Sequence, residues 1–394
     1  TFTPSSDGAT TIAVAAGVYT DAPGNANTAS NTFAWTYDST VPTLTSVSIA
    51  STNSTSTLVK HGEDVVLTFT ASETIGTPVV TFLSGGAAIT DGLINYSNTS
   101  GNTWTATYDV RYSDTEGAVT FSVAFSDTVG NAGTAVTVVT DGTSVTFDKT
   151  PPTISEVTAI TTPTNDNTPS YVFTTNEAGS ITSSNTLTGD VTAEVNNNTI
   201  TFATLSDGTY ESVTIIVTDA TGNSSSALAV TTFVIDTTAP TFSTSPASVT
   251  VECSASSEPS ATGTALSGDS TATVSYSDST VDGTGNNSVI TRVWTATDPA
   301  GNSTTYTQTI TVVDTTAPTF TTSPASVTVE CNTSTSVSRL GTAAASDNCD
   351  SDVTIAYADT TVTGIGNNSV ITRVWTATDD NGNASTYTQT ITIE

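Results

Sequence analysis

Residues 236–253 read DTTAPTFSTSPASVTVEC, and residues 314–331 read DTTAPTFTTSPASVTVEC. A second shared stretch, GNNSVITRVWTATD, ends at Asp298 and again at Asp379. Near-copies that recur in the same order indicate a tandem array in which each copy is one structural repeat. The fold of the chain therefore depends on the fold of one repeat.

Two shorter elements carry the repeat through the rest of the 394 residues. The boundary element D-x-T-x-P begins at Asp38, Asp148, Asp236 and Asp314. The element D-x-x-G-N begins at Asp21, Asp127, Asp219, Asp298 and Asp379. Because the two elements alternate, they predict a C-terminal domain remnant at 1–38 and complete domains at 39–148, 149–236, 237–314 and 315–394.

The period of apolar residues within a unit is two. Val65, Leu67 and Phe69 alternate with polar or smaller residues, and so do Val119 and Phe121. This period is typical of strands, and no window sustains a helical period. Turn residues interrupt the chain every ~8 to 12 residues, which is the spacing of β-sandwiches. We therefore expect an all-β chain of small sandwiches.

The boundary and turn elements together resemble bacterial immunoglobulin-like repeats. The V-T-V-E-C and W-T-A-T-D stretches of 237–314 and 315–394 also resemble HYR modules, and S-D-N-C at 346–349 strengthens that likeness. The resemblance implies a linear tandem array of immunoglobulin-like β-sandwich domains. It also implies an extracellular or cell-surface location, as in the stalks of adhesins and other secreted repeat proteins.

The charge of the chain limits its partners. There are 37 acidic and 6 basic residues, which gives a formal net charge of -31. Such a polyanion is repelled by nucleic acids and by anionic membrane surfaces. No apolar run is long enough to span a membrane, so we expect no direct membrane insertion. No leader is visible at Thr1, and the partial first unit indicates that the chain starts inside a domain.

The acidic residues of the two elements should meet at the boundaries. In an immunoglobulin-like sandwich, the D-x-x-G-N turn follows the sixth strand and lies at the pole where the chain enters. The boundary aspartate ends the preceding unit beside that same pole. The expected pairs are Asp38 with Asp127, Asp148 with Asp219, Asp236 with Asp298, and Asp314 with Asp379.

A third acid is available at each of these poles. Glu73 and Glu177 each lie four residues beyond a strand phenylalanine, and Asp269 and Asp347 fall in the equivalent region of the last two units. Three carboxylates without a basic partner repel one another. Ca²⁺ would relieve this repulsion, because it takes six to eight oxygen ligands. The twelve acids named here and in the four pairs are therefore predicted calcium ligands.

The same motifs also allow an interpretation without a metal. D-x-x-G-N is a good turn, since its aspartate can accept backbone N–H bonds and its glycine can adopt a positive φ. An aspartate before T-x-P can likewise organise a linker turn. The sequence alone leaves two interpretations open. Either Ca²⁺ is bound at most junctions, or the motifs form turns without a metal.

The three cysteines point to an oxidising compartment. Cys331 and Cys349 lie in one unit, so we predict a disulfide between them, worth ~3 kcal/mol. Cys253 repeats the position of Cys331, but Ser270 stands where its partner should be. Cys253 is then either a buried free thiol or the site of an intermolecular bridge.

The sequence argues against an enzyme. His61 is the single histidine, and no nucleophile motif or phosphate loop accompanies it. Acids that recur in every unit are unlike a catalytic pair. Trp294 and Trp375, within the repeated W-T-A-T-D stretch, are expected in the cores of their units.

The leading prediction is a non-enzymatic structural stalk or extender of an adhesin or surface filament, stiffened by Ca²⁺ at its domain junctions. One alternative is a binding module that recognises a glycan or a protein. Another is a subunit that polymerises by strand complementation, with the first unit completed by a second chain. Expected partners are further copies of the repeat array, through lateral or end-to-end self-assembly, and a surface glycan or protein.

Overall fold

A computed structural model describes residues 2–90 and 92–394. Its internal contacts divide the chain into two compact units. Unit 1 consists of the residues up to Ile160 together with Thr168–Thr204 and Glu211–Thr232, and unit 2 consists of Thr161–Asn167, Leu205–Tyr210 and Phe233–Glu394. None of the described helices has the length and apolar character that a membrane crossing requires.

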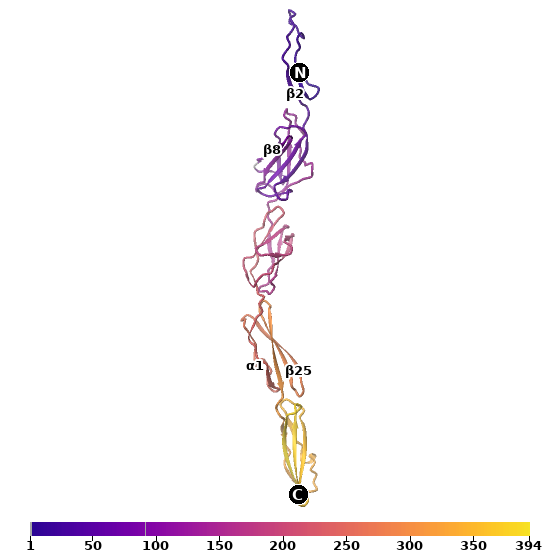
Figure 1. Cartoon of the computed structure of the whole chain (residues 1–394), viewed down its shortest axis with the longest axis vertical. Coiled ribbons are helices and arrows are strands. Elements are labelled where there is room, and N and C mark those ends of the chain that lie inside the picture. The colour runs from indigo at the N-terminus through magenta and orange to yellow at the C-terminus, as the bar shows by residue number, and fades with distance from the viewer. Residues whose placement is uncertain (1, 91) are drawn as a thin grey trace. The chain divides into compact units, whose positions relative to one another are not determined.

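Within unit 1, the strands from Leu44 to Phe147 form a two-layered sandwich (Figure 1). One sheet has the order β3-β5-β9-β8, formed by Leu44–Ser51, Asp64–Ala71, Thr103–Asp109 and Asn95–Ser100. The other has the order β4-β11-β10-β6-β7, formed by Leu58–Val59, Thr146–Phe147, Gly117–Ala124, Val79–Ser84 and Ala87–Ala88. The first sheet corresponds to strands A, B, E and D of an immunoglobulin sandwich, formed here by β3, β5, β9 and β8. The second contains strands C, F and G, formed here by β6, β10 and β11.

Alternation of apolar residues fixes which face of each strand is buried. In β5, Val65, Leu67 and Phe69 are fully buried, and the residues between them are partly exposed. In β10, Val119 and Phe121 face the same core from the opposite sheet. The predicted strand period is thus confirmed in this sandwich.

Unit 1 contains three more sheets. One has the order β12-β13-β17-β15, formed by Ile154–Thr158, Ser170–Thr175, Asn196–Phe202 and Leu187–Thr188. The next has the order β16-β14-β19-β20, formed by Thr192–Ala193, Gly179–Ser183, Thr214–Thr218 and Leu228–Ala229. The third is only a hairpin of β1 (Gly8–Ile12) and β2 (Phe33–Tyr37), on which Ile12 and Phe33 are exposed.

Unit 2 holds a short pair of strands, β18 (Gly208–Tyr210) and β21 (Phe233–Ile235), and two similar repeats. The 237–314 repeat contains β22 (Phe242–Thr244), β23 (Val249–Glu252), α1 (Pro259–Thr262), β24 (Leu266–Ser267), β25 (Thr273–Asp282), β26 (Ser288–Thr297) and β27 (Ser303–Val313). The 315–394 repeat contains β28 (Thr319–Thr322), β29 (Val327–Val329), α2 (Val337–Leu340), β30 (Ala344–Ser346), β31 (Thr354–Thr363), β32 (Ser369–Thr378) and β33 (Ala384–Ile393).

Each repeat of unit 2 pairs a two-stranded sheet with a four-stranded one. The sheet orders are β22-β24 and β23-β27-β26-β25 in the first repeat, and β28-β30 and β29-β33-β32-β31 in the second. The long strands of the larger sheet run beside the label β25 in Figure 1. Their first strand, β23 or β29, runs parallel to the last, β27 or β33. The all-β fold class of immunoglobulin-like repeats is confirmed.

A buried arginine supports the small core of each repeat. Arg292 is only 1% exposed, and its Nε and Nη2 donate to the two carboxylate oxygens of Asp278, each at 2.8 Å. The guanidinium carbon lies 4.5 Å from the ring centre of Tyr276. Trp294 is buried nearby, as predicted, and Arg373 repeats the arrangement with Asp359. The charge is thus both paired and stacked, as a buried guanidinium requires.

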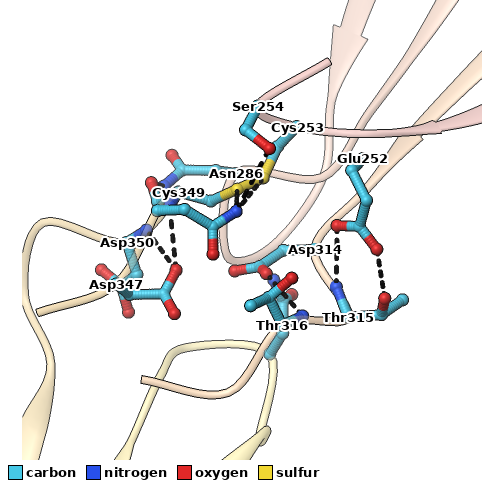
Figure 2. Close-up of a disulfide and its surroundings, with 12 residues drawn as sticks. Glu252, Cys253, Ser254, Asn286, Asp314, Thr315, Thr316, Asp347, Cys349 and Asp350 are labelled. Carbon is cyan, nitrogen blue, oxygen red and sulfur yellow. Dashed lines mark hydrogen bonds between the residues drawn. A yellow bond between two sulfur atoms is a disulfide. The ribbon is translucent and has the colours of Figure 1, made fainter. Parts of the chain in front are cut away.

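The disulfide predicted between Cys331 and Cys349 is wrong. Cys349 is bonded instead to Cys253 of the preceding repeat, with Cα atoms 6.0 Å apart, and Cys331 is free and exposed (Figure 2). Cys253 is therefore neither a free thiol nor the site of an intermolecular bridge, because its partner Cys349 lies in the same chain.

Strand length explains why Cys331 cannot reach Cys349. The N–H of Cys331 donates to the carbonyl of Glu394, just beyond the end of β33. Cys349 is followed by Asp350, which accepts from the N–H of Asp380, ahead of the start of β33. The two cysteines therefore lie at opposite ends of a ten-residue strand, and such a strand is about 33 Å long.

Peptide mapping of the unreduced chain should recover a Cys253–Cys349 crosslink, with Cys331 as the single alkylated cysteine. The Cys331→Ser variant should keep the crosslink and lose the thiol, because Cys331 takes no part in the bond. A crosslink between Cys331 and Cys349 would contradict the structure.

Candidate metal sites

The D-x-x-G-N element forms a turn whose aspartate is saturated by backbone N–H groups. Asp127 Oδ1 accepts from the N–H groups of Val129, Gly130 and Asn131 at 2.9, 2.7 and 2.8 Å. Gly130 has a φ of 109°, which favours glycine at that position. Although burial raises the pKa of Asp127, the hydrogen bonds from Asn131, Gly130 and Val129 outweigh it and hold that pKa below its usual value.

The asparagine of this element ties the turn to the linker that precedes the domain. Asn131 Nδ2 donates to Asp127 Oδ2 at 2.6 Å and to the backbone carbonyl of Asp38 at 3.0 Å. The same pair of bonds recurs with Asn223 to Asp219 and Asp148, with Asn302 to Asp298 and Asp236, and with Asn383 to Asp379 and Asp314. The structure thus brings the boundary and turn aspartates together at all four junctions.

A second acid holds each linker from the side of the preceding repeat. Asp7 accepts from Ser39 and Thr40, and Glu116 accepts from the backbone of Lys149 and the hydroxyl of Thr150. The corresponding acids in unit 2 are Asp207, which holds Thr237 and Thr238, and Glu252, which holds Thr315. The sequence predictions missed these four acids. Three of them share a short motif that could have indicated them, S-D-G at 6–8 and 206–208 and T-E-G at 115–117, whereas Glu252 lies outside it.

Three of the predicted ligands meet at the first junction. Asp38, Glu73 and Asp127 each place a carboxylate oxygen within 4.8 Å of the others. Asp38 belongs to the linker, Glu73 to the loop after β5 and Asp127 to the turn after β10. Glu73 also lines an open cleft beside Asp7.

Glu73 is the least satisfied acid of this cluster. Its Oε1 is buried and has no hydrogen-bond partner. Burial, followed by the charges of Asp38, Asp127 and Asp7, raises the pKa of Glu73 above its usual value. The three charges that act on Glu73 are all negative.

The second junction repeats the arrangement. Asp148, Glu177 and Asp219 also lie with carboxylate oxygens within 4.8 Å of one another. Burial and the charges of Asp148 and Asp219 raise the pKa of Glu177. Burial and the charge of Asp219 likewise raise the pKa of Asp148. Oxygen-only clusters of this kind suit a hard cation such as Ca²⁺.

The two junctions of unit 2 are arranged differently. Asp269 uses one oxygen to accept from the N–H and hydroxyl of Thr271, and it joins no three-acid cluster among the described residues. Asp347 accepts from the N–H groups of Cys349 and Asp350.

At the junction between the two repeats of unit 2, three side chains of kinds that can bind metals lie close together: Asp314, Cys253 and Cys349. The two sulfurs form the disulfide and so cannot act as thiolate ligands. Asp314 Oδ2 and Asp347 Oδ2 are nevertheless buried without hydrogen-bond partners. The calcium-ligand assignments at all four junctions stay predictions.

Residues 319–393 match the family model described as an HYR-like domain with 4 cysteines. The matched stretch carries two cysteines, Cys331 and Cys349. None of the curated proteins matches the sequence significantly. The predicted resemblance to immunoglobulin-like repeats, with an HYR module in the C-terminal region, is confirmed.

Several solved tandem structures resemble the chain at low identity. An I-band fragment of titin has 14% identity and a TM-score of 0.34, covering 70% of this chain and 100% of its own. A protocadherin gammaB7 structure has 14% identity and a TM-score of 0.24, covering 86% of this chain and 98% of its own. The immunoglobulin pair of DIP-gamma has 16% identity and a TM-score of 0.24, covering 48% and 97%. Likenesses this distant carry no argument about function.

The Asn131→Ala variant tests the link between turn and linker. It removes two hydrogen bonds, one of them to a carboxylate, so we expect a loss of about 1–2 kcal/mol in the stability of the 39–148 sandwich. Calorimetric unfolding measures the loss. The matched control is Asn98→Ala, which removes one exposed bond within a hairpin. Equal effects of the two variants would contradict a structural role for Asn131.

The raised pKa of Glu73 predicts a pH-dependent variant effect in the presence of a chelator. A carboxyl group whose pKa is higher in the folded chain favours folding while protonated, and this contribution is lost as the pH rises through the folded pKa. The Glu73→Gln variant should therefore gain stability relative to wild type as the pH rises from about 4 to 7. Thermal unfolding at both pH values measures the gain. The exposed Glu211→Gln variant is the control, and a difference that does not change with pH would argue against crowding at Glu73.

Proposed function

We propose that the chain is a non-enzymatic structural stalk or extender of an extracellular adhesin or surface filament, stiffened by Ca²⁺ at its domain junctions. Its tandem immunoglobulin-like and HYR-like architecture suggests a structural or adhesion-type extracellular protein. The disulfide supports an oxidising location. Domains of this kind are typically non-enzymatic.

The observation that carries the calcium proposal is the pair of three-acid clusters in unit 1. Each cluster joins one acid of the linker to two acids of the following sandwich. This crowding raises the pKa of the glutamate in both clusters and that of Asp148 in the second. A divalent cation relieves this crowding, because it replaces repulsion among the acids with attraction to one centre.

A bound ion would act on the flexibility of the linker. Asp38 and Asp148 sit at the points where the chain passes from one repeat to the next, and an ion that they share with the following sandwich would fix those points. The linkers are already held by hydrogen bonds on both sides. Calcium would add an interaction that depends on the extracellular ion concentration, since extracellular calcium-binding modules have Kd values near 10⁻⁴–10⁻³ M.

Calorimetric unfolding with Ca²⁺ and with chelator tests the proposal. An ion that binds only the folded chain stabilises it by mass action, by about 2.7 kcal/mol per site at a concentration 100 times Kd. We expect a rise of several degrees in the melting temperature of unit 1 with Ca²⁺. Sodium chloride at matched ionic strength should give a much smaller rise, because it screens the acids without bridging them.

The variants that accompany this experiment separate the two clusters. Glu73→Gln should abolish the calcium response of the first junction and leave that of the second. Glu73→Gln combined with Glu177→Gln should abolish both, while the exposed Glu211→Gln should change neither. The calcium proposal would be refuted if the double variant kept the wild-type rise in melting temperature with Ca²⁺, or if the wild type showed no rise. The acidic motifs would then act only as turns.

A further inference from the structure

The junction between the two repeats of unit 2 is a covalent and hydrogen-bonded contact. Cys253, just after β23, is bonded to Cys349 in the turn after β30. Asn286 Nδ2 of the first repeat donates to the carbonyl of Cys349 at 2.5 Å, and Figure 2 shows these residues together with Glu252 and Thr315. Glu252 accepts from the backbone and the hydroxyl of Thr315.

The loop between β25 and β26 completes the contact. Asn287 Nδ2 donates to Asn381 Oδ1 at 3.0 Å, and Asn287 Oδ1 accepts from the N–H of Asp314 at 2.9 Å. Asn381 Nδ2 donates to the carbonyl of Gly285 at 2.6 Å. A Cβ on Gly285 would lie 2.4 Å from Asn381 Oδ1, so a side chain at that position would force the Asn381 side chain out of this contact.

The 315–394 repeat carries the same surface at its own far end. We define its exit face as Glu330, Cys331, Gly366, Asn367 and Asn368, which occupy the places of Glu252, Cys253, Gly285, Asn286 and Asn287 in the shared V-T-V-E-C and G-N-N-S-V-I-T stretches.

Two backbone hydrogen bonds of the exit face match those of the docked loop, although Asn286 has a φ of 62° and Asn367 does not share this positive φ. The N–H of Cys331 bonds to the carbonyl of Glu394 at 2.9 Å, as that of Cys253 bonds to Val313 at 2.9 Å. The loop closes with a bond from Gly364 to Asn368 at 2.8 Å, which matches the bond from Gly283 to Asn287 at 2.7 Å. Gly366 has open space around it. The neighbouring Ile365 is 98% exposed.

We propose that the exit face binds a further HYR-like module and forms a disulfide to it through Cys331. The thiol of Cys331 is free and exposed, whereas its counterpart Cys253 is already used in that way. Two thiols lose two protons and two electrons when the bond forms. A low-molecular-weight disulfide such as oxidised glutathione accepts them and becomes two thiols.

The structure also defines which module fits. The incoming module must carry a cysteine at the place of Cys349 and an asparagine at the place of Asn381. The 315–394 repeat meets both requirements. The 237–314 repeat meets neither, because Ser270 and Thr271 follow Asp269 there and Ala300 stands at the place of Asn381. The occupant is therefore a module of the S-D-N-C type.

An extended chain tests this inference directly. A second copy of residues 314–394 is appended after Glu394, and the product is equilibrated in a glutathione redox buffer with a chelator present throughout. Five cysteines should then form two disulfides and leave one thiol. Peptide mapping should show Cys331 bonded to the Cys349 copy in the appended module. Three free thiols, or Cys331 bonded to the Cys331 of a second molecule, would overturn the proposal.

Two variants of the extended chain separate docking from chance oxidation. Gly366→Asn should slow formation of the new disulfide by roughly tenfold, equivalent to about 1.4 kcal/mol of lost docking. Asparagine tolerates the positive φ of this position but fills the space that the incoming Asn381 needs. Ile365→Thr, which restores the residue of the 237–314 repeat, should leave the rate unchanged. Equal rates in all three chains would show that the cysteines meet without docking. Because the chelator removes calcium, the outcome is independent of the calcium proposal.

Discussion

The backbone of each linker must find hydrogen-bond partners where one repeat ends and the next begins, and the acidic residues of this chain supply and organise them. An acid of the preceding repeat accepts from the linker residues that follow the boundary aspartate, as Asp7 does from Ser39 and Thr40. The asparagine of the following turn donates to the carbonyl of the boundary aspartate, as Asn131 does to Asp38. These polar contacts hold the linker from both sides, and they leave the apolar residues of a small domain for its own core.

The acids that do this work differ in how well they are satisfied. Asp127 accepts four hydrogen bonds and its pKa is lowered, whereas Glu73, a few ångströms away, has a buried oxygen without a partner and a raised pKa. In this cluster the turn aspartate is satisfied and the glutamate bears the repulsion, and in the second cluster Glu177 shares it with Asp148. A chain that only needed turns would gain stability by losing Glu73 and Glu177. Their place in both clusters is the physical reason to connect the clusters with a cation.

The sequence predicted most of the fold because its signals are local or repeated. The alternation of Val65, Leu67 and Phe69 specifies a buried strand face, and the copied boundary elements specify the tandem order. The pairing of boundary and turn aspartates also followed from the general order of strands in a sandwich. The asparagine that joins each pair stands in the motif itself, yet its bond to the linker carbonyl depends on a geometry that spacing does not reveal.

The remaining features depend on distances between elements. Pairing Cys331 with Cys349 assumed that cysteines of one repeat are neighbours, but β33 separates them by its whole length. Asp7, Glu116 and Asp207 each stand in a short S-D-G or T-E-G motif, and Glu252 does not. Nothing in so short a motif indicates a linker contact, so the shared role of these acids becomes visible only when the linkers are placed beside them. The different acid arrangement of unit 2 likewise reflects a shorter sandwich, in which the region of Asp269 forms its own turn.

The disulfide between Cys253 and Cys349 gives the chain an unusual response to a pulling force. The two residues are 96 positions apart, and the strands β24 to β30 lie within the loop that they close. Tension applied at the ends passes through the sulfur atoms and bypasses this loop. About 300 Å of extended polypeptide therefore stays out of the load path, even if the hydrogen bonds within this loop break. Only a reductant can release that length, so the extensibility of this part of the chain is controlled by thiol chemistry as well as by force.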